Sequence, residues 1–201
     1  MDALIEKLKS IEHGFKHIIE AGDLILKDTS INHLEFGTKL LDCDAYQIRM
    51  LATYLFGQLS VENKKALEIL ETRIATDDNW RVQEMLAKAF DYYCQTVGYE
   101  KSLTKIKSWI NDKNPNIKRA VIEGLRIWTN RPYFKENTEL AIRLIAQFKS
   151  DDSEYLRKSI GNSLRDISKK HKVLVDNEIS NWNLADKKIM FIQKLIYKYE
   201  L

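Results

Sequence analysis

The sequence is poor in glycine and proline, with 7 and 2 among its 201 residues. Because these residues mark the turns between strands, their scarcity disfavours a protein of short strands and favours long helices. No apolar run approaches the roughly 18 residues of a membrane-spanning helix, so we expect no membrane partner. The opening MDALIEKLKSIEHGF is charged and amphipathic and lacks the apolar middle of a signal peptide. We therefore expect a cytoplasmic protein.

Metal-binding residues and excess charge are also scarce. Cys43 and Cys94 share no metal-ligand spacing, and His13 and His17 lie four residues apart without a third ligand. We therefore expect no bound metal. The formal net charge of +3, from 32 basic and 29 acidic residues, is too small to indicate a nucleic-acid partner by itself. Only charge gathered on one face would do so.

One pattern occurs four times in the chain. It reads IRMLATYLFGQLS from Ile48, VQEMLAKAFDYYC from Val82, IKRAVIEGLRIWT from Ile117 and LRKSIGNSLRDIS from Leu156. The four starts are 34, 35 and 39 residues apart, and a short acidic or Asn/Pro-containing turn precedes each copy. A helical period of this size predicts a stacked array of antiparallel helix pairs, an all-α solenoid. With no linker in view, we expect one domain over residues 1–201.

Apolar spacing and capping residues place the individual helices. The expected helices cover 2–27, broken near Gly22, and 30–41, followed by the pairs 61–74 with 80–94, 99–110 with 115–129, 134–148 with 153–170, and 173–182 with 186–199. Asn114 is expected to cap a helix whose first residue is Pro115. Asp151 and Glu154 are spaced as a capping box.

Alignment of the four copies predicts one polar strip. The copy starts and the positions four and eight residues later are mostly apolar and predict the core. Two other columns lie four residues apart, and therefore on one helix face. They read Met50, Glu84, Arg119, Lys158 and Tyr54, Lys88, Glu123, Asn162. Since the second helices of a curved array line its concave side, we expect these eight side chains to form a concave basic groove.

An aromatic ring extends the strip, because Trp80 lies four residues before Glu84. An aromatic ring beside a carboxylate, with Arg and Lys around them, suits a cationic nucleobase within a phosphate backbone. The alternative is a purely structural one. A glutamate beside arginine and lysine is usually a solvated ion pair worth roughly 0–1 kcal/mol, and a tryptophan at a helix start usually packs in the core.

Three segments of the chain carry a family resemblance. They are NWRVQEMLAKAFDYY from Asn79, NPNIKRAVIEGLR from Asn114 and YLRKSIGNSLRDISKKH from Tyr155. In this order they resemble the motifs of the AlkC/AlkD-type DNA alkylation repair glycosylases, which are HEAT-like helical arrays. The resemblance extends over roughly residues 40 to 200 through the repeat register. It implies a HEAT-like solenoid fold.

The resemblance also implies roles for particular residues. Trp80 takes the place of the family's active-site tryptophan and Glu84 that of its catalytic carboxylate, with Glu123 as an assisting carboxylate. Arg119 falls on a backbone-binding arginine. The remaining residues assigned to DNA binding are Lys158, Asn162, Arg165 and Lys88. The AlkD branch has an aspartate where Glu84 stands and a second tryptophan where Asn162 stands, so the chain lies between branches.

The implied reaction is hydrolysis of the N-glycosidic bond of an alkylated purine such as 3-methyladenine or 7-methylguanine. Such a base is already cationic and leaves without protonation, so the protein's task is to stabilise an oxocarbenium-like sugar. Double-stranded DNA with alkylated bases is the implied partner, without a cofactor, and we expect a monomer. Two other functions stay open: a relative that binds DNA without excising bases, and a HEAT-type protein-interaction scaffold.

Overall fold

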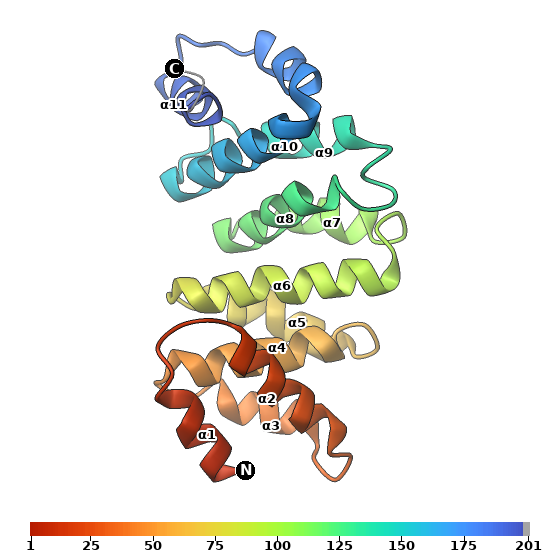
Figure 1. The fold of residues 1–201 in the computed structure, drawn as a ribbon, viewed down its shortest axis with the longest axis vertical. Coiled ribbons are helices and arrows are strands. Elements are labelled where there is room, and N and C mark those ends of the chain that lie inside the picture. The colour runs from red at the N-terminus through yellow and green to blue at the C-terminus, as the bar shows by residue number, and fades with distance from the viewer. Residues whose placement is uncertain (199–201) are drawn as a thin grey trace. The chain divides into compact units, whose positions relative to one another are not determined.

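The computed structural model describes residues 1–198, and all its regular elements are helices (Figure 1). The predicted all-α fold is therefore confirmed over the described residues. The chain divides into two compact units, Met1–Val97 and Gly98–Leu201. No helix within residues 1–198 is both long and apolar enough to cross a bilayer. The prediction of a single domain, a curved array and a basic groove stays a prediction.

The first unit contains six α-helices and one turn of 3₁₀-helix. They are α1 (Asp2–Lys9), α2 (Lys16–Lys27), α3 (His33–Leu40), α4 (Tyr46–Leu59), α5 (Lys64–Thr72), η1 (Ile74–Thr76) and α6 (Trp80–Val97). Helices α4 and α6 pack along each other, and α1, α2 and α3 pack on α4 (Figure 1). The predicted break near Gly22 is wrong, because α2 continues through this residue. The chain breaks earlier, between α1 and α2, where Gly14 adopts a positive φ of 95°.

The second unit, of which residues 98–198 are described, contains five helices. They are α7 (Leu103–Ile110), α8 (Pro115–Trp128), α9 (Thr138–Ala146), α10 (Glu154–Ser180) and α11 (Lys187–Ile196). Two helices were expected over 153–170 and 173–182, and α10 does consist of two helical stretches that meet at a kink at His171, whose φ of −130° and ψ of 45° are not helical (Figure 1). The closing helix ends at Ile196, and its predicted end at Tyr199 lies outside the described residues.

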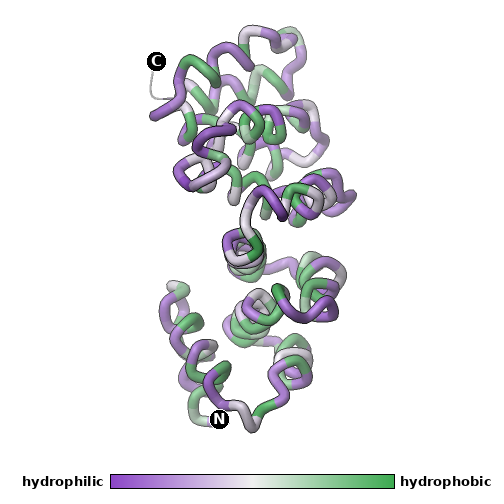
Figure 2. The backbone as a smooth tube through the Cα atoms, turned by 90° about the vertical axis from the view of Figure 1, so that its right-hand side faces the viewer, coloured by the Kyte–Doolittle hydropathy of each residue, from purple (hydrophilic) through white to green (hydrophobic). Residues whose placement is uncertain are grey.

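The repeated apolar positions form the core of both units. All twelve side chains at the copy starts and at the positions four and eight residues later are at most 2 % exposed: Ile48, Ala52, Phe56, Val82, Leu86, Phe90, Ile117, Val121, Leu125, Leu156, Ile160 and Leu164. Hydrophobic and hydrophilic residues accordingly alternate around the helical turns (Figure 2). Burial of this apolar surface is the main force that holds the helices together.

The turns before the repeats cap the helices and link neighbouring ones. The side chain of Asn114 accepts from the backbone N–H of Asn116 at 2.8 Å, which confirms the predicted cap. The capping box at Asp151 is wrong. Ser153 caps α10 instead, because Asp151 lies two residues before this N-cap and accepts from the Ser153 N–H at 2.9 Å. Asp151 also pairs with Lys118 of α8 at 3.0 Å.

The same kind of link joins α4 to the turn before α6. The Arg49 guanidinium meets the Asp77 carboxylate at 2.6 Å, and Asp77 also accepts from the backbone N–H of Asn79 at 2.8 Å. Hydrogen bonding to Asp77 raises the pKa of Arg49. This ion pair and this hydrogen bond hold the turn that precedes α6, and Trp80 is the first residue of that helix.

The contact between α4 and α6 depends on a glycine. A Cβ atom built on Gly57 would lie 2.6 Å from the Cβ and 2.9 Å from the Cα of Ala89. Because the obstacle includes backbone, Gly57→Val should force the helices apart and lower the free energy of unfolding by about 1–3 kcal/mol. Urea denaturation measures the loss. Gln58→Val is the control for valine's lower helix propensity, and equal losses in both variants would contradict the close-packing explanation.

Candidate functional site

The first half of α6 presents three of the predicted site residues at helical spacing. Trp80, Glu84 and Lys88 are four residues apart and share a face. Trp80 is 54 % exposed, Glu84 is half-buried and Lys88 is exposed. The usual fate of a tryptophan at a helix start, burial in the core, does not apply to Trp80. A large aromatic surface therefore lies open to solvent one turn from a carboxylate.

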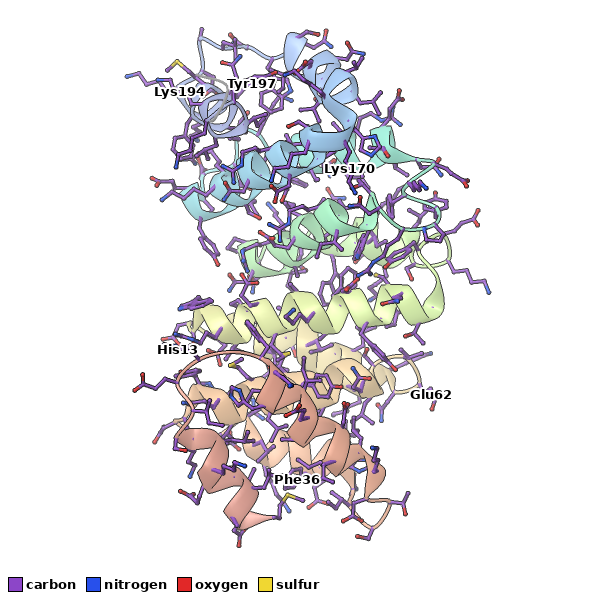
Figure 3. All side chains as sticks on the ribbon, viewed as in Figure 1. His13, Phe36, Glu62, Lys170, Lys194 and Tyr197 are labelled. Carbon is purple, nitrogen blue, oxygen red and sulfur yellow. The ribbon has the colours of Figure 1, made fainter. Side chains whose placement is uncertain are left out.

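An arginine that the sequence reasoning did not single out lies over Trp80. The Arg81 Cζ atom is 4.4 Å from the centroid of the Trp80 ring and 5.1 Å from that of Tyr46, at the start of α4. Arg81 Nη2 donates to Nδ1 of His13 at 3.2 Å. Figure 3 shows His13 in the α1–α2 connection, beside the start of α6. Arg81 thus joins three separate stretches of the first unit.

The N-terminal segment covers part of the face that was expected to be open. The Lys88 Nζ atom lies 5.2 Å from the centroid of the Phe15 ring. The Tyr54 hydroxyl donates to the Asp23 carboxylate, and burial, followed by this hydrogen bond, raises the pKa of Tyr54. The Tyr54 ring also lies against Gly22, where a Cβ atom would be 2.2 Å from the ring. Within the first unit, Tyr54 and Lys88 therefore contact the chain's own N-terminal segment.

In the second unit, Glu123 of α8 belongs to an ion-pair network. Its Oε1 accepts from the Ser159 hydroxyl at 2.7 Å and lies 3.9 Å from Arg119, and its Oε2 lies 3.3 Å from Arg126. The Glu123 side chain is 15 % exposed. Both carboxylate oxygens thus have polar partners, and positive charge surrounds them.

Arg119 lies at the buried end of this network. It is 6 % exposed, and its Cζ atom lies 4.9 Å from the centroid of the Tyr155 ring. The expectation that all eight column residues form one exposed polar strip is therefore wrong in two places. Arg119 is covered by Tyr155, and Met50 is 1 % exposed because α1, α2 and α3 pack on α4.

The three predicted DNA-binding residues on α10 differ in environment. Lys158 is exposed and pairs with Glu154 at 2.8 Å, so a competing anion can displace this solvated pair at little cost. Asn162 is half-buried. Arg165, also half-buried, donates from Nη1 to the Leu195 carbonyl of α11 at 3.4 Å. Lys158 is thus the most accessible of the three.

The contacts of the N-terminal segment could not be predicted from the sequence pattern. The packing of the N-terminal segment on α4 and α6 joins residues up to 73 positions apart, and no repeat signal reports it. The sequence indicated only that Arg81 follows Trp80 directly, and not that its guanidinium lies over the Trp80 ring. Within residues 1–198, no group of three or more His, Cys, Asp or Glu side chains is placed to hold a metal ion.

Comparison with known proteins gives concordant matches. The family described as "DNA alkylation repair enzyme" matches residues 23–179. The structure of AlkD2 from Streptococcus mutans superimposes with a TM-score of 0.91 at 46 % identity, covering 98 % of this chain and 96 % of that one. The structure of smu.31 from Streptococcus mutans UA159 superimposes with a TM-score of 0.84, also at 46 % identity, covering 92 % of each chain.

A curated relative matches a shorter stretch. The protein YhaZ of Bacillus subtilis (strain 168) is 31 % identical over 87 residues, which are 41 % of this chain and 24 % of that protein. The match therefore spans about a quarter of the relative's length. The two streptococcal structures, in contrast, match 98 % and 92 % of this chain and support the helical-repeat fold.

Proposed function

The chain belongs to the DNA alkylation repair enzyme family, and we propose that it is a DNA glycosylase that releases cationic alkylated purines, of the 3-methyladenine and 7-methylguanine type. The observation that carries the proposal is the exposed Trp80 ring one helical turn from Glu84 on α6. The proposed partner of the protein is double-stranded DNA. We also propose that the protein acts as a monomer in the cytoplasm.

The proposed chemistry is electrostatic. As the bond between C1′ and the purine nitrogen breaks, its electron pair moves onto the base, which becomes neutral, and the sugar takes up the positive charge. A carboxylate at Glu84 stabilises this charge and accepts the proton of the water that adds to C1′. The Trp80 ring packs on the sugar or the cationic base, where its π face favours positive charge.

The remaining site residues take binding and supporting roles in the proposal. Lys158, with Lys88, Asn162 and Arg165, binds the DNA backbone. Glu123 and Arg119 hold α8 and α10 together rather than contact the sugar, because both oxygens of Glu123 are already engaged and Arg119 is buried. Arg119 then affects DNA binding indirectly, by setting the position of α10 and its lysine.

A second function, DNA binding without base excision, is favoured by one specific observation. The Arg81 guanidinium lies over the Trp80 ring at 4.4 Å, where it would repel a cationic purine that stacks on the same face. A relative of this kind would bind the phosphate backbone at this surface and leave the glycosidic bond intact. The protein-interaction scaffold has no such observation in its favour.

Base release from methylated duplex DNA tests the proposal. Purines released by the wild-type protein are separated by chromatography, and DNA binding is measured in parallel over a series of salt concentrations. Release of 3-methyladenine or 7-methylguanine above the spontaneous rate supports a glycosylase. No release together with salt-sensitive DNA binding supports the second function, and absence of DNA binding at low salt rejects both.

A further inference from the structure

Arg81 is held in one orientation by groups around it. Its guanidinium lies between the Tyr46 and Trp80 rings, with Cζ 5.1 Å and 4.4 Å from their centroids, and it donates to His13 at 3.2 Å. The Tyr46 hydroxyl in turn donates to the Glu12 carbonyl at 2.7 Å. A planar guanidinium stacked on rings keeps its N–H edge available for a further acceptor. Arg81 therefore presents ordered donors at a half-exposed position.

Within residues 1–198, Arg81 forms no ion pair with an acidic side chain, and its contacts are the two rings and His13. Other arginines of the first unit do have acidic partners: Arg49 pairs with Asp77, and Arg73 pairs with Asp42. Lys88, on the same helix, is like Arg81 in that an aromatic ring contacts its charged group, in this case the ring of Phe15. Two cations of α6 are thus held by aromatic rings rather than by carboxylates.

The spacing of these two cations suits a nucleic-acid backbone. Arg81 and Lys88 are seven residues apart, two helical turns, and so lie about 10 Å apart along the helix axis. On one strand of B-DNA each phosphate advances the axis by about 3.4 Å and also turns around it, so the straight-line gap between phosphates exceeds this rise, and the two long side chains suit phosphates fewer than three nucleotides apart. Glu84 lies between them in the sequence, three residues after Arg81 and four before Lys88.

We propose that Arg81 binds a DNA phosphate on the strand whose nucleotide faces Trp80, as the counterpart of Lys88 on the other side of Glu84. The inference rests on the proposed function only for its partner, double-stranded DNA, and does not require base excision. The sign of the charge supports a phosphate over a base, because a cationic purine would be repelled. Bidentate binding of phosphate oxygens is the chemistry that a pre-ordered guanidinium performs best.

The salt dependence of DNA binding tests this inference. Each phosphate contact contributes about −0.9 to the slope of log affinity against log salt. Arg81→Gln should therefore bind duplex DNA more weakly at 50 mM salt, with a slope less steep by about 0.9, so that the deficit narrows by about 3.5-fold between 50 and 200 mM. The effect should be the same for methylated and unmodified DNA, since a phosphate carries no base identity.

Two further variants separate phosphate binding from a structural role. Arg81→Lys keeps the charge, so its slope of log affinity against log salt should equal that of the wild type. If Arg81 had only a structural role, Arg81→Gln and Arg81→Lys would both have a lower melting temperature and an unchanged slope. Arg143→Gln removes an exposed arginine that pairs with Glu139 at 3.6 Å, and its slope should equal that of the wild type. An unchanged slope in Arg81→Gln overturns the inference.

The outcomes for base release and for Arg81 are independent. Base release with an unchanged slope in Arg81→Gln would leave the glycosylase standing and remove Arg81 from the DNA contact. A reduced slope without base release would retain the phosphate contact and reject the glycosylase.

Discussion

Replacement of Glu84 by glutamine is expected to slow base release by about 10²–10³-fold while DNA binding is largely retained. Glutamine has the same shape but no negative charge, so it cannot stabilise the sugar cation or accept a proton from water. Losses of this size are typical when one preorganised electrostatic group is removed from an active site. Single-turnover release of purines from methylated DNA measures the rate, and titration with the same duplex measures binding.

Glu123→Gln is the matched control for this experiment. It removes the other carboxylate of the predicted strip, which already contacts Ser159 at 2.7 Å and Arg126 at 3.3 Å. We expect less than a tenfold change in the rate, on the order of 1.4 kcal/mol, together with a lower melting temperature. Unimpaired release by Glu84→Gln would remove Glu84 from the chemistry. A large loss in Glu123→Gln at unchanged stability would transfer the role to Glu123.

Truncation of Glu123 to alanine is expected to lower the free energy of unfolding by about 3 kcal/mol. Arg119 is 6 % exposed and lies 3.9 Å from Glu123, so Glu123→Ala removes one carboxylate from beside a buried positive charge. Removal of one partner from a buried ion pair costs far more than the pair contributes, because the remaining charge is not rehydrated. Urea denaturation followed by circular dichroism measures the loss.

An exposed ion pair supplies the comparison. Arg143 and Glu139 on α9 are 63 % and 67 % exposed, so Arg143→Gln should change the unfolding free energy by no more than about 0.5 kcal/mol. The double variant Arg119→Met/Glu123→Leu should recover part of the stability lost in Glu123→Ala, because it removes the buried charge of Arg119 together with the carboxylate beside it. A loss in Glu123→Ala as small as that in Arg143→Gln would show that Arg119 finds water or another partner.

The helical framework followed from the sequence because local rules determine it. The apolar stripe at the copy starts predicted the core, and Asn114 with Pro115 predicted the start of α8. Before α10, both Asp151 and Ser153 are residue types that can cap a helix N-terminus. The spacing to Glu154 predicted Asp151 as the cap, but Ser153 is closer to the free N–H groups of α10 and accepts from the Leu156 N–H.

The candidate site was less accessible to prediction, because its environment comes from residues far apart in the sequence. The repeat register placed Trp80, Glu84 and Lys88 on one face of α6. It carried no information on α1 to α3, which bury Met50, or on Tyr155, which covers Arg119. Columns of a repeat report which side chains are equivalent within a helix, and they do not report what packs on that helix from outside the repeat.

The contacts of the N-terminal segment also bear on how the chain folds during synthesis. Phe15 and His13 leave the ribosome well before Lys88 and Arg81, the side chains that they contact in the folded unit. At about 5–20 residues per second, the 73 positions between Phe15 and Lys88 correspond to roughly 4–15 s. During that interval α6 is not yet available, so the N-terminal segment cannot complete its packing against α4 and α6. The first unit therefore acquires its final packing only when α6 emerges, and chaperone binding is expected to concentrate on nascent chains shorter than this.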